Sequence, residues 1–280
     1  MQESVAHVPH PALRPYVPGM VGYRYDGVPP AVHRGLPSPY LTLVITLDEP
    51  LEVVASASGV GRYAALLGGL DLSPALIVRP PRQSGIQLML SPLGARALLG
   101  LPAAALAAVH VELGDVLRPA AQELTDRLRT VGPWPARFAV LERFLGRLLR
   151  DEATAGPEVR EAWRLTTSSG GQIRVEDLAR HVGWSPRHLT VRFRAETGLA
   201  PKEAARVVRF DRARRQLALR AVSGSPLDLA GLAADRGWYD QAHLTRDWRA
   251  FSGLAPTRWL AEEIGFVQDG AMAAAAASLS

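Results

Sequence analysis

The sequence predicts a two-domain protein. We expect an α+β N-terminal domain with a β-rich core and a helical pair, then an all-α C-terminal domain of two helix-turn-helix units joined by a long helix. Three observations predict this fold class: short apolar runs separated by Pro and Gly fill residues 1–92, helical periodicity begins at Leu93, and one segment of the last third occurs twice. The 280 residues are enough for two hydrophobic cores.

The N-terminal part combines predicted strands with two predicted helices. The strands are the β-branched or apolar runs Tyr40–Leu47, Leu51–Ala57, Ala75–Pro80 and Gly85–Pro92. Helical spacing of apolar residues follows in Leu117–Val131 and Pro135–Glu152, which Pro133 and Pro135 separate. The second helix has an apolar stripe, Leu141, Phe144, Leu145 and Leu148, wide enough to pack on a partner helix of the same chain or of a second chain.

Composition excludes several classes of protein. There is no cysteine, which removes disulfides, thiolate metal sites and cysteine nucleophiles. No apolar run approaches the roughly 18 to 20 residues that span a bilayer, and the N-terminus lacks a signal-peptide layout, so we expect a cytoplasmic protein. The formal charge of +5 lies entirely within residues 170–265, which hold 16 basic and 11 acidic residues. This asymmetry indicates that the C-terminal part faces a polyanion.

The repeat is the most informative feature of the chain. His188–Pro201, HLTVRFRAETGLAP, matches His243–Pro256, HLTRDWRAFSGLAP, at an offset of 55 residues. Upstream, LARHVGW at Leu178–Trp184 corresponds to LAADRGW at Leu232–Trp238 at an offset of 54. One structural unit therefore occurs twice, and the turn of the second copy is one residue longer.

Each copy is predicted to form a helix, a glycine turn and a second helix. In the first copy Gly183 permits the tight turn, Ser185 caps the next helix and Pro186 occupies its first position. A spacing of 100° per residue places Leu189, Arg192 and Phe193 on the inward side of that helix. In the second copy Leu244 and Trp248 face inward.

The outward arcs carry side chains that suit a major groove. Arg can bond guanine edges, Thr can bond either type of base, and Ala or Val can contact the thymine methyl. The outward residues are Arg187, Thr190, Val191 and Arg194 in the first copy, and Ala242, Thr245, Arg246 and Arg249 in the second. An ordinary solvated helix face is the alternative for either copy alone, but it gives no reason for a duplication.

A single long helix is predicted between the copies, within Lys202–Ser223. Its inward side carries Val207, Val208, Phe210, Asp211, Ala213, Leu217 and Ala218. About 18 residues at 1.5 Å each span roughly 27 Å, which is near the roughly 34 Å of one DNA turn. Two readers could therefore enter successive major grooves. Five arginines of this helix are predicted to be divided between phosphate-facing and solvated positions: Arg206, Arg209, Arg212, Arg214 and Arg215.

Residues 157–264 resemble the AraC/XylS family of bacterial transcription regulators. The family pattern is present as LARHVGWSPRHLTVRFRAETGLAPKE, VRFDRARRQL and LAADRGWYDQAHLTRDWRAFSGLAPTRW. The resemblance implies two helix-turn-helix units on a long helix, with base-reading positions early in each recognition helix. The N-terminal half, through HPALRPYVPGMVGYRY and RGLPSPYLTLVITL, resembles the sensor domains of one subgroup, which implies effector sensing, dimerisation or both.

The resemblance assigns residues to roles at DNA. The positions that correspond to base readers are Arg187, Thr190, Val191, Gln241, Ala242, Thr245 and Arg246. For phosphate contacts we expect Arg194, Arg249, Ser185 and Arg209. Val191 departs from the basic or polar residue that is frequent in the family, so its contact with a base would be apolar.

We therefore predict a sequence-specific transcription regulator, activator or repressor, that is not an enzyme and needs no cofactor. The predicted parts are an effector or dimerisation domain at 1–152, a linker at 153–156, a DNA-binding domain at 157–266 and a disordered tail at 267–280. Double-stranded DNA is the expected partner. RNA polymerase, a small-molecule effector and a second copy of the chain are partners left open, and no membrane is expected.

Two rival functions are less well supported. A metal enzyme would have to gather His7, His10, His33 and His110, yet the sequence has neither HxH nor HExxH spacing. A constitutive or architectural DNA-binding protein would have a solid N-terminal core, whereas a sensor would have a pocket there. The aromatic candidates for either role are Trp134, Tyr16, Tyr23, Tyr25, Tyr40 and Tyr63.

Overall fold

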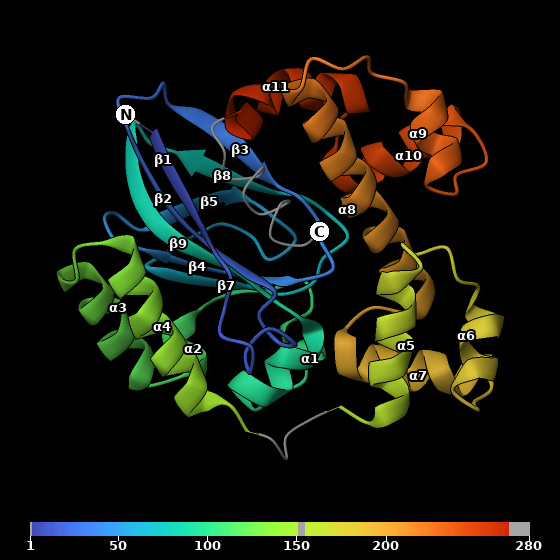
Figure 1. Cartoon of the computed structure of the whole chain (residues 1–280), viewed down its shortest axis with the longest axis horizontal. Helices are drawn as coiled ribbons and strands as arrows, with labels where there is room; N and C mark the ends of the chain where they lie inside the picture. The colour runs from blue at the N-terminus through green and yellow to red at the C-terminus, as the bar shows by residue number, and fades with distance from the viewer. Residues whose placement is uncertain (1, 151–154, 269–280) are drawn as a thin grey trace.

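The computed structural model describes residues 2–150 and 155–268, with side chains through Glu263. It has a sheet-rich N-terminal part and a helical C-terminal part, and the predicted fold class is confirmed. Figure 1 shows the sheets on one side, with a helical pair beneath them, and the C-terminal helices on the other side. Of the predicted linker, residues 153 and 154 lie outside the described part. The predicted tail begins inside a helix that extends to Gln268, and its residues 269–280 lie outside the described part.

Two antiparallel sheets form the N-terminal domain. The larger has the order β1-β2-β9-β4-β7-β10 and the smaller has the order β3-β8-β5-β6. The larger sheet contains β1 Gln2–His7, β2 Gly19–Asp26, β4 Leu41–Thr46, β7 Ala65–Gly68, β9 Arg82–Leu90 and β10 His110–Glu112. The smaller sheet contains β3 Ala31–Gly35, β5 Leu51–Ala55, β6 Gly61–Tyr63 and β8 Ala75–Arg79. The four strands predicted from the sequence correspond to β4, β5, β8 and β9.

Short helices and a helical pair follow the sheets. The short elements are α1 Pro92–Gly94, the π-helical η1 Ala95–Leu99, the 3-10 helix η2 Ala103–Leu106 and α2 Leu113–Val116. The pair consists of α3 Ala120–Thr130 and α4 Trp134–Leu148, and Pro133 and Pro135 lie at the start of the second helix, where they separate the two helices as predicted. The first helix begins after Pro119, three residues later than its predicted start at Leu117. Gly22 of β2 leaves the space that the Trp134 ring occupies, since a Cβ there would lie 2.5 Å from that ring.

The C-terminal domain consists of seven helices in the described part of the chain. They are α5 Pro157–Ser168, α6 Val175–His181, α7 Pro186–Thr197, α8 Pro201–Val222, α9 Leu229–Asp235, α10 Gln241–Ser252 and α11 Pro256–Gln268. The predicted long helix is α8, and every residue predicted for its inward side is buried. Its 22 residues make it about 33 Å long, since each residue adds 1.5 Å.

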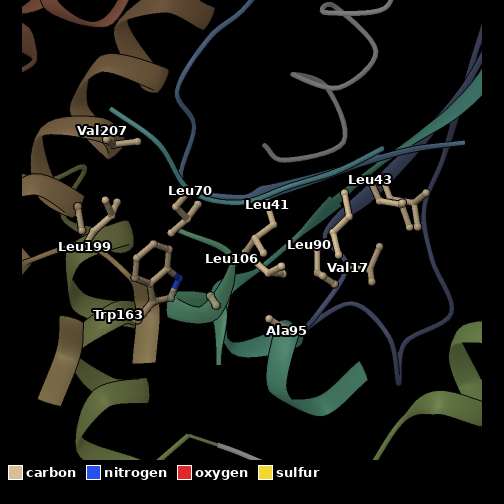
Figure 2. Close-up of a cluster of buried hydrophobic side chains, with 14 of the residues drawn as sticks. Val17, Leu41, Leu43, Leu70, Leu90, Ala95, Leu106, Trp163, Leu199 and Val207 are labelled. Carbon is tan, nitrogen blue, oxygen red and sulfur yellow. The ribbon is translucent and has the colours of Figure 1, made fainter. Parts of the chain in front are cut away.

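One hydrophobic core continues across the domain boundary. Leu41 of β4, Leu70 in the segment after β7 and Leu106 of η2 belong to one cluster with Leu199 and Trp163 of the helical domain (Figure 2). Because burial of apolar surface is the main stabilising contribution to folding, this continuous core holds the two domains against each other.

Candidate nucleic-acid interface

The turn in each unit is built as the sequence predicts. Gly183 has φ of +73° and Gly237 has φ of +77°, values that residues with a Cβ rarely adopt. Ser185 caps α7, because its hydroxyl accepts a hydrogen bond from the His188 N–H at 3.2 Å. The Asp240 carboxylate caps α10 in the same way, accepting from the His243 N–H at 2.7 Å. The two recognition helices, α7 and α10, therefore begin with equivalent geometry.

Each recognition helix is held by a buried aromatic residue. Phe193 of α7 packs on Trp163, with ring centroids 5.9 Å apart, and Trp248 of α10 packs on Phe210 at 5.2 Å. Both side chains are fully buried. The placement of Arg192 on the inward side was wrong, since this residue is exposed. Its position in α10 is taken by Asp247, which is buried, so the two copies differ on this side of the helix.

The residues expected to read bases share one property: none of them is buried. Arg187 and Val191 of α7 are exposed, and Thr190 is partly exposed, with its hydroxyl donating to the Pro186 carbonyl at 2.8 Å. The residues of α10 are Gln241, Ala242 and Arg246, which are exposed, and Thr245, which is partly exposed. All seven stay predictions as base readers.

The residues expected to contact phosphates lie in different settings. Ser185 and Arg249 are exposed, and Arg194 is exposed although its guanidinium donates to Glu203 at 2.8 Å. Arg209 lies on α8 and not on a recognition helix. Its guanidinium donates to the Gly237 and Gly171 carbonyls at 3.0 Å each and lies 5.5 Å from the Trp238 ring centre. Arg209 therefore ties the turn before α6 and the turn of the second unit to α8, and its contact with a phosphate stays a prediction.

A buried ionic network joins α8 to the second recognition helix. The Asp247 carboxylate accepts hydrogen bonds from Arg206 at 2.8 Å and from the Trp238 indole at 2.9 Å. Burial alone raises the pKa of Asp247, but these two hydrogen bonds outweigh burial and hold the pKa below its ordinary value. Asp247 is therefore ionised at neutral pH, and its contribution to stability is lost only when acid protonates it.

A second network holds two arginines on the side of α8 that faces the N-terminal domain. Asp211, which is buried, accepts from Arg214 at 2.6 Å and from Arg215 at 2.8 Å. Arg206, Arg209 and Arg212 also donate hydrogen bonds to protein groups. All five arginines are therefore bonded within the chain, whereas the sequence predicts phosphate-facing or solvated positions for them.

A cavity of about 260 Å³ lies between the two sheets and reaches the C-terminal domain. Tyr23 and Met89 of the larger sheet and Ile77 of the smaller sheet contribute apolar lining. Arg214 and Arg215 of α8 and Trp259 of α11 complete the wall. Of the six aromatic residues proposed as pocket or core, Tyr23, Tyr25 and Tyr40 line the cavity.

The polar lining of the cavity is predominantly cationic. Two of the lining residues are acidic, Glu3 and Asp71, and five are arginines, Arg24, Arg34, Arg79, Arg214 and Arg215. The Asp71 carboxylate accepts hydrogen bonds from the backbone N–H groups of the next two residues, Leu72 and Ser73. Burial lowers the pKa of His110, so its imidazole is neutral at neutral pH. Burial also raises the pKa of Tyr25 to about 12, which keeps its hydroxyl protonated.

Ionic contacts tie the N-terminal domain to the first helix-turn-helix unit and to α11. Arg96 of η1 forms a bidentate pair with Glu196 of α7, with both N–O distances 2.8 Å. At the other end, His33 of β3 lies 2.6 Å from Glu263 of α11, and the Arg34 guanidinium donates to Glu262 at 2.7 Å. The second of these contacts borders the cavity, because His33 and Arg34 belong to its lining.

The four histidines considered for a metal site are distributed over several contacts. His7 stacks on Phe138 and lies 3.0 Å from the Glu142 carboxylate, while His33 pairs with Glu263. Within residues 2–150 and 155–268, no group of three or more His, Asp or Glu side chains gathers in a geometry that could hold a metal ion. In the same part of the chain, no helix has the length and apolarity needed to cross a bilayer.

Residues 178–262 match the family model described as a helix-turn-helix domain. The match covers both repeated units and α8. It confirms the resemblance to AraC/XylS regulators for this part of the chain, which is a DNA-binding domain of the type found in transcription regulators. A comparison with the curated proteins found no match.

Several solved structures are similar to this chain. ToxT from Vibrio cholerae is 10% identical over 87% of this chain and 97% of its own, with a TM-score of 0.47. The C-terminal domain of AraT, a response regulator from Geobacillus stearothermophilus, is 20% identical over 38% of this chain and 84% of its own, with a TM-score of 0.34. The AraC-like transcriptional activator CuxR is 12% identical over 79% and 88%, with a TM-score of 0.28.

Proposed function

We propose that the protein is a cytoplasmic regulator that reads DNA with both recognition helices and changes its DNA binding when a small molecule occupies the interdomain cavity. The observation that carries this proposal is the pairing of two equivalent, exposed reader helices on one rigid helix whose other side lines a pocket. In this arrangement Ser185, Arg194 and Arg249 contact phosphates. The residues that read bases are Arg187, Thr190 and Val191 of α7 and Gln241, Ala242, Thr245 and Arg246 of α10.

The length of the helix that connects the readers supports binding in successive major grooves. The helix α8 is about 33 Å long, close to the roughly 34 Å of one DNA turn. The Arg194–Glu203 pair links the first unit to this helix, and the Arg206–Asp247 pair and the Arg209 bond to Gly237 link the second. Because the units are held rigidly, little conformational entropy is lost when both of them bind.

Arg246 is the residue to test first, because it is exposed on the second reader helix and belongs to the outward arc. We expect Arg246→Ala to cost about 1 to 3 kcal/mol on the cognate site and to relax preference at one base pair. The affinity of purified full-length protein for the cognate duplex and for single-base variants measures this. Equal weakening on all sequences would show instead that Arg246 contacts only phosphate.

The lining of the cavity indicates the class of effector. The arginines of its lining favour an anion such as a carboxylate, since charge-assisted hydrogen bonds to guanidinium are stronger than neutral ones. The apolar side chains from both sheets favour a hydrocarbon body. A ligand of this kind would touch Arg214, Arg215 and Trp259 of the DNA-binding domain, so its binding energy would depend on how that domain is docked.

Filling the cavity tests the effector proposal. We expect Ala75→Trp to abolish binding of alkyl carboxylates, because Ala75 lines the cavity and the larger side chain takes the space of the ligand. Calorimetry with carboxylates of increasing chain length measures binding. The difference in affinity between each carboxylate and the alcohol of the same chain length measures the contribution of the charge. Val54→Trp, on an exposed position of the same sheet, is the control. Equal binding to wild type and Ala75→Trp would place the site elsewhere, and no binding of any carboxylate by the wild type would contradict the ligand class.

Dimerisation remains the second role proposed for the N-terminal domain. The surface considered for this role is a groove between α3 and α4, whose apolar residues Leu124, Val140 and Phe144 are buried and whose border is formed by arginines. The stripe that sequence reasoning assigned to a partner helix is mostly turned inward, since Leu141, Phe144 and Leu145 are buried within one chain. Sedimentation of the full chain over a range of concentrations measures this role, and a monomer throughout would contradict it.

A further inference from the structure

The turn of the second unit contains one residue that the first unit lacks. In the first unit Trp184 is followed directly by the helix cap Ser185. In the second unit Tyr239 stands between Trp238 and the helix cap Asp240. The two caps accept equivalent hydrogen bonds from the third residue of their helices. Tyr239 is therefore the inserted residue.

Packing does not account for this insertion. The side chain of Tyr239 is 94% exposed, the largest value among the exposed large hydrophobic side chains of the described residues. Its neighbour Trp238 is buried and donates its indole N–H to Asp247. The first unit leads from its turn to a capped helix without such a residue, so the core does not require an aromatic side chain here.

The place of Tyr239 points to DNA. It precedes the cap of a recognition helix, and when the first turn of such a helix enters the major groove, the residues just before it lie at the rim of the groove, beside the sugar-phosphate backbone. A tyrosine hydroxyl is among the side-chain groups that donate to phosphate oxygens, and the ring can cover the adjoining sugar.

We propose that Tyr239 is an uncharged contact to the DNA backbone, made only by the second unit. This inference rests on the proposed function, because it requires α10 to enter the groove. This contact would hold the second unit on DNA without the release of counterions from the phosphates. The two readers thus differ in how they are held on DNA, although their helices begin alike.

The test compares Tyr239→Phe and Tyr239→Ala with wild type in the full chain, on the duplex that the wild type enriches from random DNA. We expect Tyr239→Phe to weaken binding about 3- to 10-fold, since one neutral hydrogen bond is lost, and Tyr239→Ala to weaken it further. The loss should be equal on cognate and altered sequences. The slope of log affinity against log salt should not change, because no counterion is displaced by a neutral group.

Two matched variants separate the possible outcomes. Arg249→Ala should reduce the salt slope by about one charge, and Val60→Ala, at an exposed position of the N-terminal domain, should bind DNA like the wild type. Unchanged affinity of Tyr239→Phe would overturn the inference, even if Arg246→Ala behaves as proposed. A change of preference at one base pair would also overturn it, since Tyr239 would then read a base. Absence of DNA binding by the wild type would overturn both the inference and the proposed function.

Discussion

Trp248→Ala should unfold the second helix-turn-helix unit, at a cost of about 3–5 kcal/mol in the free energy of unfolding. Trp248 is fully buried, and its ring lies 5.2 Å from that of Phe210 and 5.5 Å from that of Trp259. Within the described residues, its indole nitrogen has no hydrogen-bond partner. The loss is therefore one of packing and burial, and the cavity left behind joins α8, α10 and α11.

Thermal unfolding followed by circular dichroism measures this effect. We expect the helical signal of the second unit to be lost at a lower temperature, while the sheets of the N-terminal domain unfold later. Tyr239→Ala is the matched control, because it removes an aromatic side chain that is exposed, and its transition should equal that of the wild type. A Trp248→Ala variant with an unchanged transition would contradict the core described for this unit.

Asp211→Asn has the second largest expected effect, about 3–5 kcal/mol, because it removes one partner of a buried ionic group. Asp211 neutralises both Arg214 and Arg215, whose side chains are only 13% and 16% exposed. Without the carboxylate, two poorly solvated guanidinium groups remain side by side at the wall of the cavity. We expect the domain contact near α8 to loosen as well as the total stability to fall.

Chemical denaturation measures the stability change, and Asp177→Asn provides the control. Asp177 pairs with Arg180 at the same distance, but both side chains are largely exposed, so its loss should cost no more than about 1 kcal/mol. Equal stability of the two variants would mean that Asp211 and its arginines are solvated. It would also remove these arginines from the wall of the proposed effector site.

Local signals explain why the C-terminal domain could be predicted closely. The repeat, the glycine turns, the helix caps and the periodicity of α8 all act over a few residues, and each is visible in the sequence. All seven residues predicted for the inward side of α8 are therefore buried, although Pro201, Ala204 and Ala205 at its start were not predicted. The failure at Arg192 has a clear cause: its angular position lies at the edge of the inward side, where tertiary packing decides between burial and exposure.

The N-terminal domain and the arginines of α8 depended on contacts that are distant in sequence. The strand β2 was missed because Gly19 and Gly22 interrupt its apolar run, and Gly22 makes room for Trp134 of α4. The sequence pattern around an arginine does not distinguish whether its guanidinium binds a phosphate, a carbonyl or a carboxylate. Only the fold brings Arg209 to the carbonyls of two separate turns, Gly171 and Gly237, and places Arg214 on the wall of a cavity between sheets.

The central claim, that one chain reads DNA with two helices about one turn apart, is tested most directly by selection of random duplex DNA with purified full-length protein at near-physiological salt. Selection is made without ligand and with the alkyl carboxylate that binds most tightly. We predict enrichment of one motif with two contacted blocks about one helical turn apart, and relaxed preference in one block when Arg246 is replaced by Ala. Enrichment of a single block that is insensitive to Arg246→Ala would contradict the claim.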